Sequence, residues 1–377
     1  MKLLFISLME GFSWGGSEEL WCKVAALALE QKQEVYISVK KWDALPPKLQ
    51  VLVNNGAHIY KRNTVPEIPG LITRIARKIY KKRAANPWDI ITNIQPDAIC
   101  INMGGPYDIA YVPQLLEIIE KENKPYYIIQ QFNYENLVLP ESIRVRAKNI
   151  FANANAVFFV SERNRKTTER NLVMGIKNAV IISNPANLNK YDSLPFPADG
   201  QCVQFASVAR LDTAYKGQDL LFEVLSSNKW KERNWKLNIF GEGPDRKYLE
   251  ELIIFFNLSE HIFLRGKTDD IAQVWTTNHL LIMPSIAEGT PLALIEAMIC
   301  GRPSVVTNVG GNSAIVKDGI TGFIAQAPTT ALLDQALERA WMEKNNWSVM
   351  GNRAHEDIMN NLDLDSYKKV YSDIITI

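Results

Sequence analysis

The chain has 377 residues, of which 47% are hydrophobic, 22% charged and 10% aromatic, and this composition excludes the disordered and collagen-like classes. Its length exceeds that of one average domain and favours two. The formal net charge of +1 gives no reason to expect nucleic acid as a partner. The four cysteines, at positions 22, 100, 202 and 300, lie far apart without metal-ligand spacing, which favours a reducing cytoplasm and predicts no metal site.

The chain begins with an apolar run, MKLLFISLM, that resembles the core of a signal peptide. The run meets Glu10 early and lacks a small-residue cleavage site, so a buried first strand explains it better. No window reaches the roughly 18 uninterrupted apolar residues of a membrane helix. The sequence therefore predicts that no segment spans a bilayer.

Short apolar runs rich in Ile, Val and Phe alternate with segments of helical periodicity, which predicts βαβ units around parallel strands buried on both faces. The alternation occurs twice, with a Pro- and Asn-rich linker at 185–201 between the two series. In the first series strands are expected at 3–8, 34–39, 57–60, 98–102, 126–130, 157–160 and 180–182.

In the second series strands are expected at 203–208, 236–240, 262–264, 280–283 and 304–307, with helices beginning near Gly217, Asp245, Asp269, Pro291 and Thr330. The predicted domains are 1–190, 191–360 and a terminal helix in 361–377. Two open α/β domains that face each other form a ligand cleft between the carboxyl ends of their strands.

Adjacent glycines, Gly15 and Gly16, occupy the first connection between strand and helix. They let a backbone approach a ligand closely, and the N–H groups of a helix start favour an anion. A plain turn with Ser17 as the helix N-cap is an equally good interpretation of this segment.

Two cations, Arg210 and Lys216, follow directly after a predicted buried strand of the second series. Cations at the carboxyl end of a strand can neutralise a departing diphosphate without a metal. Solvated surface charge is the alternative for such a pair.

Two carboxylates, Glu288 and Glu296, flank a predicted helix start at Pro291. Glu296 falls in the apolar stretch LALIEAMIC, where an unpaired carboxylate is costly to bury. Its partner is expected to be either a ribose diol or the neighbouring Arg302.

Segments 15–19, 209–221, 239–252, 265–275 and 284–311 together resemble glycosyltransferase family 4, in an order that covers nearly the whole chain. The resemblance implies an α/β protein of the GT-B fold, with two facing Rossmann-like parallel-sheet domains and the active site in the cleft between them. It also implies that the terminal helix, near residues 367–377, crosses back onto the first domain. It also implies transfer with retention of configuration and no metal, cofactor or protein nucleophile, because the leaving phosphate oxygen takes the acceptor proton.

The same resemblance implies roles for individual residues. Arg210 and Lys216 would grip the donor diphosphate, and Gly16 would approach it from the other domain. Glu296 would hold the ribose hydroxyls, while Glu288 would contact the transferred sugar. The catalytic set is Arg210, Lys216 and Glu288, and the donor-binding set is Gly15, Gly16, Gly243, Glu288, Gly289, Thr290, Pro291, Leu292 and Glu296.

The chain departs from the family pattern at two positions. Where the family often has a His near the donor sugar, this chain has Gln131, which could contact the sugar or acceptor but cannot act as a base. Where the family usually has an acidic residue after the later glycine pair, it has Ala314. Catalysis is therefore less firmly predicted than donor binding.

A basic amphipathic segment at 72–83 carries six Lys and Arg residues beside an apolar stripe. It could sit on an anionic membrane at the inner face or attract an anionic acceptor, and a core-packed helix with a solvated basic face is the alternative. The aromatic residues Trp14, Tyr107, Phe132 and Tyr134 fall in connections where sugars could stack, and ordinary packing is the alternative for each.

The sequence thus predicts a cytoplasmic, retaining glycosyltransferase of the hexosyltransferase type. It would use a UDP- or GDP-sugar, with the second domain holding the donor and the first choosing a polysaccharide, glycolipid or other glycoconjugate acceptor. Two alternatives stay open. One is a catalytically impaired nucleotide-sugar-binding protein, and the other is a nucleotide-sugar epimerase or a phosphorylase on the same fold.

Overall fold

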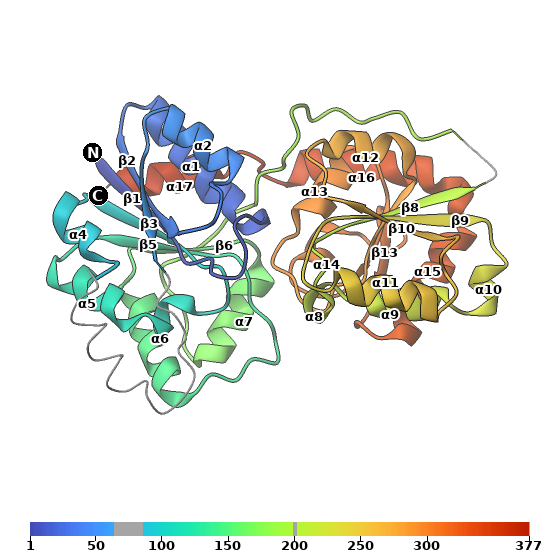
Figure 1. Ribbon diagram of the computed structural model, residues 1–377, viewed down its shortest axis with the longest axis horizontal. Helices are drawn as coiled ribbons and strands as arrows, with labels where there is room; N and C mark the ends of the chain where they lie inside the picture. Colours follow the sequence, from blue (N-terminus) through green and yellow to red (C-terminus); the bar gives the residue numbers. More distant parts are fainter. Residues whose placement is uncertain (64–85, 199–201, 377) are drawn as a thin grey trace. The chain divides into compact units, whose positions relative to one another are not determined.

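The computed structural model describes residues 1–63, 86–198 and 202–376, and these divide into two compact units (Figure 1). The first unit comprises Met1–Val160, Arg165–Ile182 and Asp365–Ile377, and the second comprises Ser161–Asn164 and Ser183–Leu364. The basic segment 72–83 of the sequence prediction lies outside the described residues.

The first unit contains a parallel seven-stranded sheet in the order β3-β2-β1-β4-β5-β6-β7. The strand order reverses between β1 and β4, which is the switch point where open α/β sheets bind ligands at the carboxyl ends of their strands. The strands are β1 Lys2–Ser7, β2 Glu34–Lys40, β3 His58–Arg62, β4 Ala98–Asn102, β5 Tyr126–Gln130, β6 Ala156–Phe159 and β7 Ala179–Ile181.

Both faces of this sheet are covered, which explains its near-continuous apolar strands. Leu4 and Ile6 of β1 point into one hydrophobic cluster, while Leu3 and Phe5 point into the other. The covering elements are η1 Gly16–Glu18, α1 Glu19–Glu30, α2 Pro47–Asn54, α4 Asp89–Ile94, η2 Asp108–Tyr111, α5 Pro113–Lys121, α6 Glu141–Asn153 and α7 Glu162–Leu172.

The second unit contains a parallel six-stranded sheet in the order β10-β9-β8-β11-β12-β13, with its switch point between β8 and β11. The edge strand β13 was not expected from the sequence, because its run GFIA begins with a glycine directly after a turn. The strands are β8 Val203–Val208, β9 Trp235–Phe240, β10 Ile262–Gly266, β11 Leu280–Met283, β12 Ser304–Thr307 and β13 Gly322–Ala325.

Three tryptophans anchor the core of the second unit. Trp235 donates its indole N–H to the carbonyl of Trp230 at 2.7 Å, and Trp347 donates to the carbonyl of Ala340 at 2.9 Å, so these buried donors are satisfied. The helices of this unit are α8 Thr213–Lys216, α9 Gln218–Leu225, α10 Asn228–Lys231, α11 Arg246–Phe255, α12 Ile271–Thr277, α13 Leu292–Ile299, α14 Asn312–Ile315, α15 Thr330–Met342, η3 Lys344–Asn346 and α16 Trp347–Asn361.

The last helix, α17 Tyr367–Ile375, belongs to the first unit and packs beside α1, where Figure 1 draws it in red next to blue. Its Val370 and Ile374 enter the cluster that also holds Leu20 and Val24. The helix α17 therefore belongs to the same unit as β1, because its apolar face is buried in the core of that unit.

The chain passes from the first unit to the second after Ile182, and the first unit resumes at Asp365. The segment after Ile182 is fastened to the second unit. The side-chain amide of Asn184 donates to the carbonyl of Thr290 at 3.0 Å, and the backbone N–H of Asn187 donates to Glu296 at 2.9 Å. These hydrogen bonds thus fix the first residues of the Pro- and Asn-rich stretch to the second unit.

Candidate functional site

The carboxyl edge of the second sheet brings together a cation and a carboxylate from two loops. Lys216, at the end of α8, lies 2.6 Å from Oε1 of Glu288, which follows β11. Ser285 also donates its hydroxyl to that oxygen, at 2.8 Å. Glu288 is 6% exposed, so this pair is largely removed from water.

The second predicted cation, Arg210, lies on the same loop after β8 and forms an ion pair with Asp212. Its backbone carbonyl accepts a hydrogen bond from the Gln218 side chain at 2.8 Å. Arg210 is about a third exposed, so its side chain reaches solvent near the same edge of the sheet.

Glycine is required where these loops meet. Gly217, between α8 and α9, has φ +61°, and a Cβ there would overlap the carbonyl oxygen of Pro284. The backbone N–H of Ile286 donates to the carbonyl of Tyr215 at 2.8 Å across the same contact. The loops that carry Lys216 and Glu288 are therefore fixed backbone to backbone.

A second glycine turn supports the other side of the Glu288 loop. Gly310 has φ +53°, and a Cβ there would overlap the carbonyl of Glu288. Gly311 donates its N–H to the carbonyl of Gly289 at 2.5 Å. These later glycines are explained by the close packing of the segment Glu288, Gly289 and Thr290, of which Glu288 and Thr290 are buried.

Glu296 lies inside α13 and is 3% exposed. Its Oε1 accepts the backbone N–H of Asn187 at 2.9 Å. Pro291 stands at the N-cap, directly before the first helical residue Leu292, with its φ of −74°. The helix start thus lies between the two carboxylates, with Glu296 one turn farther in.

The alternative that Arg302 pairs with Glu296 is wrong. The Arg302 side chain is fully buried, and its guanidinium donates to backbone carbonyls, including those of Trp275 at 2.6 Å and Cys300 at 2.8 Å. Burial lowers the pKa of this guanidinium to about 10. Arg302 is thus a structural residue that ties together the chain around residues 194, 275 and 300.

Gly243 lies after β9 and packs against the loop that carries Arg210. A Cβ on Gly243 would overlap the carbonyl of Leu211, and the backbone N–H of Asp245 donates to that same carbonyl at 3.1 Å. The glycine therefore permits close contact between two loops at this edge, whatever it contacts in a ligand.

In the first unit, Gly15 and Gly16 lead into the short turn η1 after β1. The N–H of Glu18 donates to the carbonyl of Gly15 at 3.0 Å, and Ser17 lies inside the turn without a side-chain cap. The interpretation of Ser17 as an N-cap is therefore wrong, because the helical turn already begins at Gly16.

Glu18 is the residue that sequence reasoning missed. It is 3% exposed, accepts the indole N–H of Trp21 at 3.0 Å and accepts the side-chain amide of Asn102 at 2.8 Å. Burial raises the pKa of this carboxyl to about 7, although its side-chain hydrogen bonds, including one with Ser7, oppose the shift. Acidic residues commonly begin helices on the surface, so the sequence carried no signal that this one is buried.

Gln131 directly follows β5 and is 4% exposed. Its Nε2 has no hydrogen-bond partner within the part of the chain that the structure describes. A buried amide donor of this kind suits a ligand oxygen. Ala314, the other departure from the family pattern, lies in the short helix α14.

Of the four aromatic residues considered for sugar stacking, Tyr107 is fully buried and its hydroxyl accepts the side-chain amide of Asn133 at 2.8 Å. Tyr107 is therefore a core residue. Trp14 donates its indole N–H to Glu19 at 2.7 Å. Phe132 and Tyr134 are half-buried, and their ring centroids lie 5.6 Å apart. Both remain candidates for sugar stacking.

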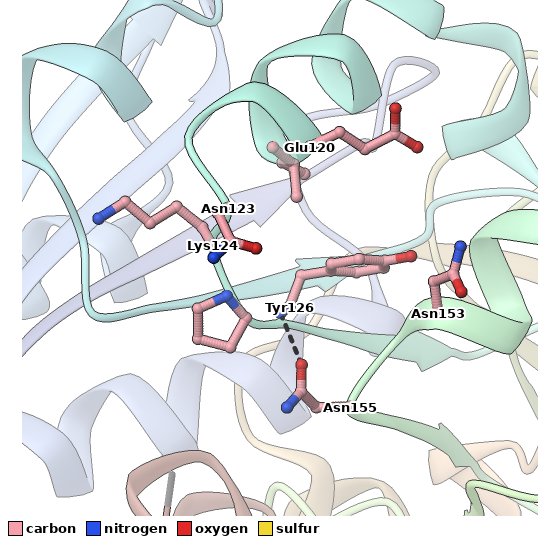
Figure 2. Close-up of a pocket in the computed structure, with 8 residues that line it drawn as sticks. Glu120, Asn123, Lys124, Tyr126, Asn153 and Asn155 are labelled. Atoms are coloured by element: carbon pink, nitrogen blue, oxygen red, sulfur yellow. Dashed lines mark hydrogen bonds between the residues drawn. The ribbon is translucent and has the colours of Figure 1, made fainter.

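A surface pocket lies at the opposite edge of the first sheet, where β5 begins (Figure 2). Figure 2 shows Tyr126 between Lys124 and Asn153, with the Tyr126 backbone N–H donating to Asn155 at 3.2 Å. It is far from the carboxyl ends of the strands along the sheet, so it takes no part in the candidate site.

The described residues contain neither a metal-binding cluster nor a helix suited to a bilayer. Within residues 1–63, 86–198 and 202–376, no group of three or more His, Cys, Asp and Glu side chains is arranged to hold a metal ion. Within the same ranges, no helix combines the length and apolar character needed to cross a membrane.

Residues 196–357 match the family model described as glycosyl transferases group 1. The N-acetyl-alpha-D-glucosaminyl L-malate synthase of Bacillus anthracis is 29% identical over 145 residues, which are 37% of this chain and 38% of that protein. The UDP-Gal:alpha-D-GlcNAc-diphosphoundecaprenol alpha-1,3-galactosyltransferase of Escherichia coli is 29% identical over 123 residues, 32% of each chain. The chain thus spans less than half the length of both relatives.

Solved structures are similar over the whole chain. The Anabaena protein HepE in complex with UDP and glucose has a TM-score of 0.72 at 17% identity and covers 99% of this chain and 98% of its own. A glycosyltransferase from Rickettsia africae has a TM-score of 0.74 at 18% identity, covering 100% and 98%. The chain therefore has the two Rossmann-like, parallel-sheet units of the GT-B fold, and its second unit carries the match to the glycosyl transferases group 1 family.

Proposed function

We propose that this protein is a retaining glycosyltransferase of family 4 that moves a sugar from a UDP- or GDP-sugar to a glycoconjugate acceptor. The observation that carries the proposal is the pairing of Lys216 with Glu288 at the carboxyl edge of the second sheet, on the loop that leads into α13 with its buried Glu296. The match of residues 196–357 and the names of the relatives support it.

In this proposal the second unit holds the donor. Lys216 and Arg210 face the diphosphate and neutralise the charge that develops on it as the bond from sugar C1 to phosphate oxygen breaks. The acceptor oxygen forms the new bond to C1, and its proton passes to the departing phosphate oxygen. Proton and charge therefore balance without a metal or a protein base.

Glu296 binds the ribose in this proposal. A carboxylate offers about four lone-pair sites, so it can accept two ribose hydroxyls in addition to the backbone N–H of Asn187. Glu288, held by Lys216 and Ser285, and the backbone from Gly289 to Leu292 then lie beside the transferred sugar.

The first unit selects the acceptor in this proposal. Gln131 offers an amide donor for a sugar hydroxyl, and Phe132 and Tyr134 offer aromatic faces. A cytoplasmic location, with membrane contact through 72–83, remains a prediction from the sequence.

One alternative is favoured by a specific residue. Gln131 stands where family members often have a His near the donor sugar, and this departure favours a protein that binds a nucleotide sugar without transferring it. Such a protein would bind the donor and release no sugar from it. An epimerase would instead interconvert the donor without any acceptor.

The experiment that tests the proposal is calorimetric titration of the full chain, without added metal, against a panel of UDP- and GDP-sugars. We expect saturable binding of one donor and its loss in Arg210→Ala and Glu296→Ala. Arg233→Ala is the matched control, because Arg233 pairs with Glu338 elsewhere in the second unit. No binding of any donor by the wild-type protein would refute the proposal, and unchanged affinity in Glu296→Ala would refute the ribose assignment.

A further inference from the structure

The chain enters the second unit through residues 183–187, which form neither helix nor strand. Ala186 is 1% exposed and lies in the hydrophobic cluster that also holds Leu294 of α13. Pro185 confines the residue before it, Asn184, to extended backbone. The backbone that carries the Asn184 side chain is therefore held in place by a proline and by an apolar contact with α13.

The amide of Asn184 reaches the loop between β11 and α13. The side chain is 3% exposed, and its Nδ2 donates to the carbonyl of Thr290 at 3.0 Å. The peptide after Thr290 leads into Pro291, the N-cap residue of α13, so this peptide has a carbonyl but no N–H. Asn184 thus holds the one hydrogen-bonding group of the peptide that leads into the helix start.

The preceding peptide of the same loop is held by a different segment. The carbonyl of Gly289 accepts the backbone N–H of Gly311 at 2.5 Å. The first N–H groups of α13, which follow directly, have no partner within the helix and suit a ligand oxygen. Fixing these two carbonyls therefore fixes the course of the backbone up to those N–H groups.

The other half of the Asn184 amide is not used inside the protein. Its Oδ1 is buried and accepts no hydrogen bond within the described residues. Rotating the amide is no remedy, because Oδ1 would then face the carbonyl of Thr290. An apolar side chain of the same shape gives up one hydrogen bond but also removes one unpaired buried oxygen, so stability gives little reason for asparagine here. Such a departure from good packing is typical of functional sites.

We propose that Asn184 is a positioning residue of the donor site, which holds the Gly289–Leu292 backbone in the shape that contacts the transferred sugar. The inference rests on the proposed function, because there the sugar is the ligand of this loop. Asn184 acts through the carbonyl of Thr290 and does not itself touch the donor.

The nucleotide part of the donor has other contacts in the proposed site. The two cations after β8 face the diphosphate, and Glu296 binds the ribose. The backbone N–H of Asn187 donates to Glu296 at 2.9 Å, and the buried Ala186 anchors that backbone independently of the Asn184 side chain. Removing the Asn184 amide should therefore weaken the contacts to the sugar and spare those to the nucleotide.

The experiment compares a nucleotide sugar with the same nucleoside diphosphate without the sugar. Calorimetric titration of the full chain gives the Kd of the UDP- or GDP-sugar that wild type binds, and the Kd of UDP or GDP alone. Asn184→Leu keeps the approximate volume and removes the amide, so its affinity for the nucleotide sugar should fall about tenfold, the contribution of one hydrogen bond. Its affinity for the diphosphate alone should stay within about twofold of wild type.

Asn278→Leu is the matched control. Asn278 is 1% exposed and precedes β11, at the opposite end of that strand from Glu288. Its Nδ2 donates to the carbonyl of Val274 at 2.7 Å and its Oδ1 accepts the Asn238 amide at 2.9 Å, so both halves of this amide are paired. Asn278→Leu should lower the midpoint of thermal unfolding more than Asn184→Leu does. Measured below that transition, it should keep the wild-type ratio of the two Kd values.

A second variant covers the case in which Asn184→Leu does not fold. Asn184→Ala removes the same hydrogen bond to Thr290 and adds no bulk. It should raise the ratio of the Kd of the nucleotide sugar to the Kd of the diphosphate by about the same tenfold factor. A general loss of structure would weaken the binding of both compounds and leave this ratio unchanged.

The outcomes separate the two proposals. A wild-type ratio of the two Kd values in Asn184→Leu or Asn184→Ala overturns the role of Asn184 and leaves the proposed function standing. Absence of nucleotide-sugar binding in wild type overturns both. A ratio that rises in the Asn184 variants and not in Asn278→Leu supports the inference.

Discussion

Two buried glutamates at the carboxyl edges of the two sheets differ in what surrounds them. Glu288, in the second unit, has Lys216 at 2.6 Å, whereas Glu18, in the first, is held by the neutral donors of Trp21 and Asn102. Their exposed fractions are 6% and 3%. The two carboxyl groups are thus buried to a similar degree, but a cation offsets the cost of burying Glu288, whereas neutral hydrogen-bond donors stabilise Glu18.

The comparison teaches that burial alone does not define the chemistry of a carboxylate. A paired carboxylate keeps a nearby cation in a defined position, where it can meet a charged ligand. A buried carboxylate held only by neutral donors is protonated more easily, because no cation offsets its charge. Substituting the cation in the second unit and the carboxyl in the first should therefore have different consequences.

The largest expected effect is in the second unit. Lys216→Ala removes the cation and leaves Glu288 buried without it, so we expect donor turnover to fall by about 100- to 1000-fold. Steady-state rates with a bound donor measure this loss. Lys216→Arg is the control that keeps the charge, and equal activity in wild type and Lys216→Ala would remove this lysine from the mechanism.

In the first unit, Glu18→Gln should change the pH dependence of stability. The folded pKa, about 7, lies above the ordinary value of 4.5, so the folded state binds the proton more tightly than the unfolded state. The free energy of unfolding of wild type should therefore decrease as pH rises from about 4.5 to 7 and level off above, by about 3 kcal/mol in total.

Chemical denaturation at several pH values measures that decrease. Glu18→Gln has no carboxyl at this position and should lack this part of the pH dependence, whereas Glu19→Gln should keep it. A wild-type stability that rises over the same window relative to Glu18→Gln would contradict the assignment of the raised pKa to Glu18.

A smaller effect is expected where the glycine turn supports the Glu288 loop. Gly310→Ala combines a left-handed φ of +53° with overlap of the Glu288 carbonyl, so we expect a loss of roughly 2–4 kcal/mol. Gly319→Ala has a similar φ of +74° but only Arg339 at 3.9 Å, and should lose about 1–2 kcal/mol. The difference in stability loss between the two variants, measured by thermal unfolding, gives the cost of the overlap with the Glu288 carbonyl. Equal losses of stability would show that this close contact is unimportant.

The smallest effect concerns a residue that the sequence placed among the candidates for sugar stacking. Tyr107→Phe removes the hydroxyl that accepts from Asn133 inside the core, so we expect a destabilisation of about 1 kcal/mol. Donor turnover should stay unchanged, because the ring is fully buried. A loss of acceptor affinity without a loss of stability would restore the stacking role.

The sequence predicted most of the fold because buried parallel strands read as continuous apolar runs. Eleven residues of β1 and β4 illustrate this, since all except Lys2 are buried. The edge strand β13 was missed because its run GFIA begins with a glycine, a residue that is depleted in strands. The place where the chain passes to the second unit, after Ile182, depends on hydrogen bonds of Asn184 and Asn187 to residues about a hundred positions away, which no local sequence pattern reports.

The sequence motifs identify candidate site residues, but the contacts of those residues depend on tertiary packing. Lys216 and Glu288 entered one catalytic set through the family resemblance, and the structure pairs them at the carboxyl edge of the second sheet. The role of Arg302 could not be predicted, because its partners are backbone carbonyls that no sequence pattern reports. Glu18 could not be distinguished from an exposed acid at a helix start for the same reason.

The most direct test of the central claim is the anomeric configuration of the sugar that the protein first releases from its donor in water. Proton magnetic resonance during slow hydrolysis of an α-linked UDP- or GDP-sugar distinguishes the anomers before they interconvert. The account predicts that the α-anomer appears first, in wild type and not in Lys216→Ala. Initial release of the β-anomer would contradict retention, and binding without any release, with or without acceptor, would contradict glycosyl transfer itself.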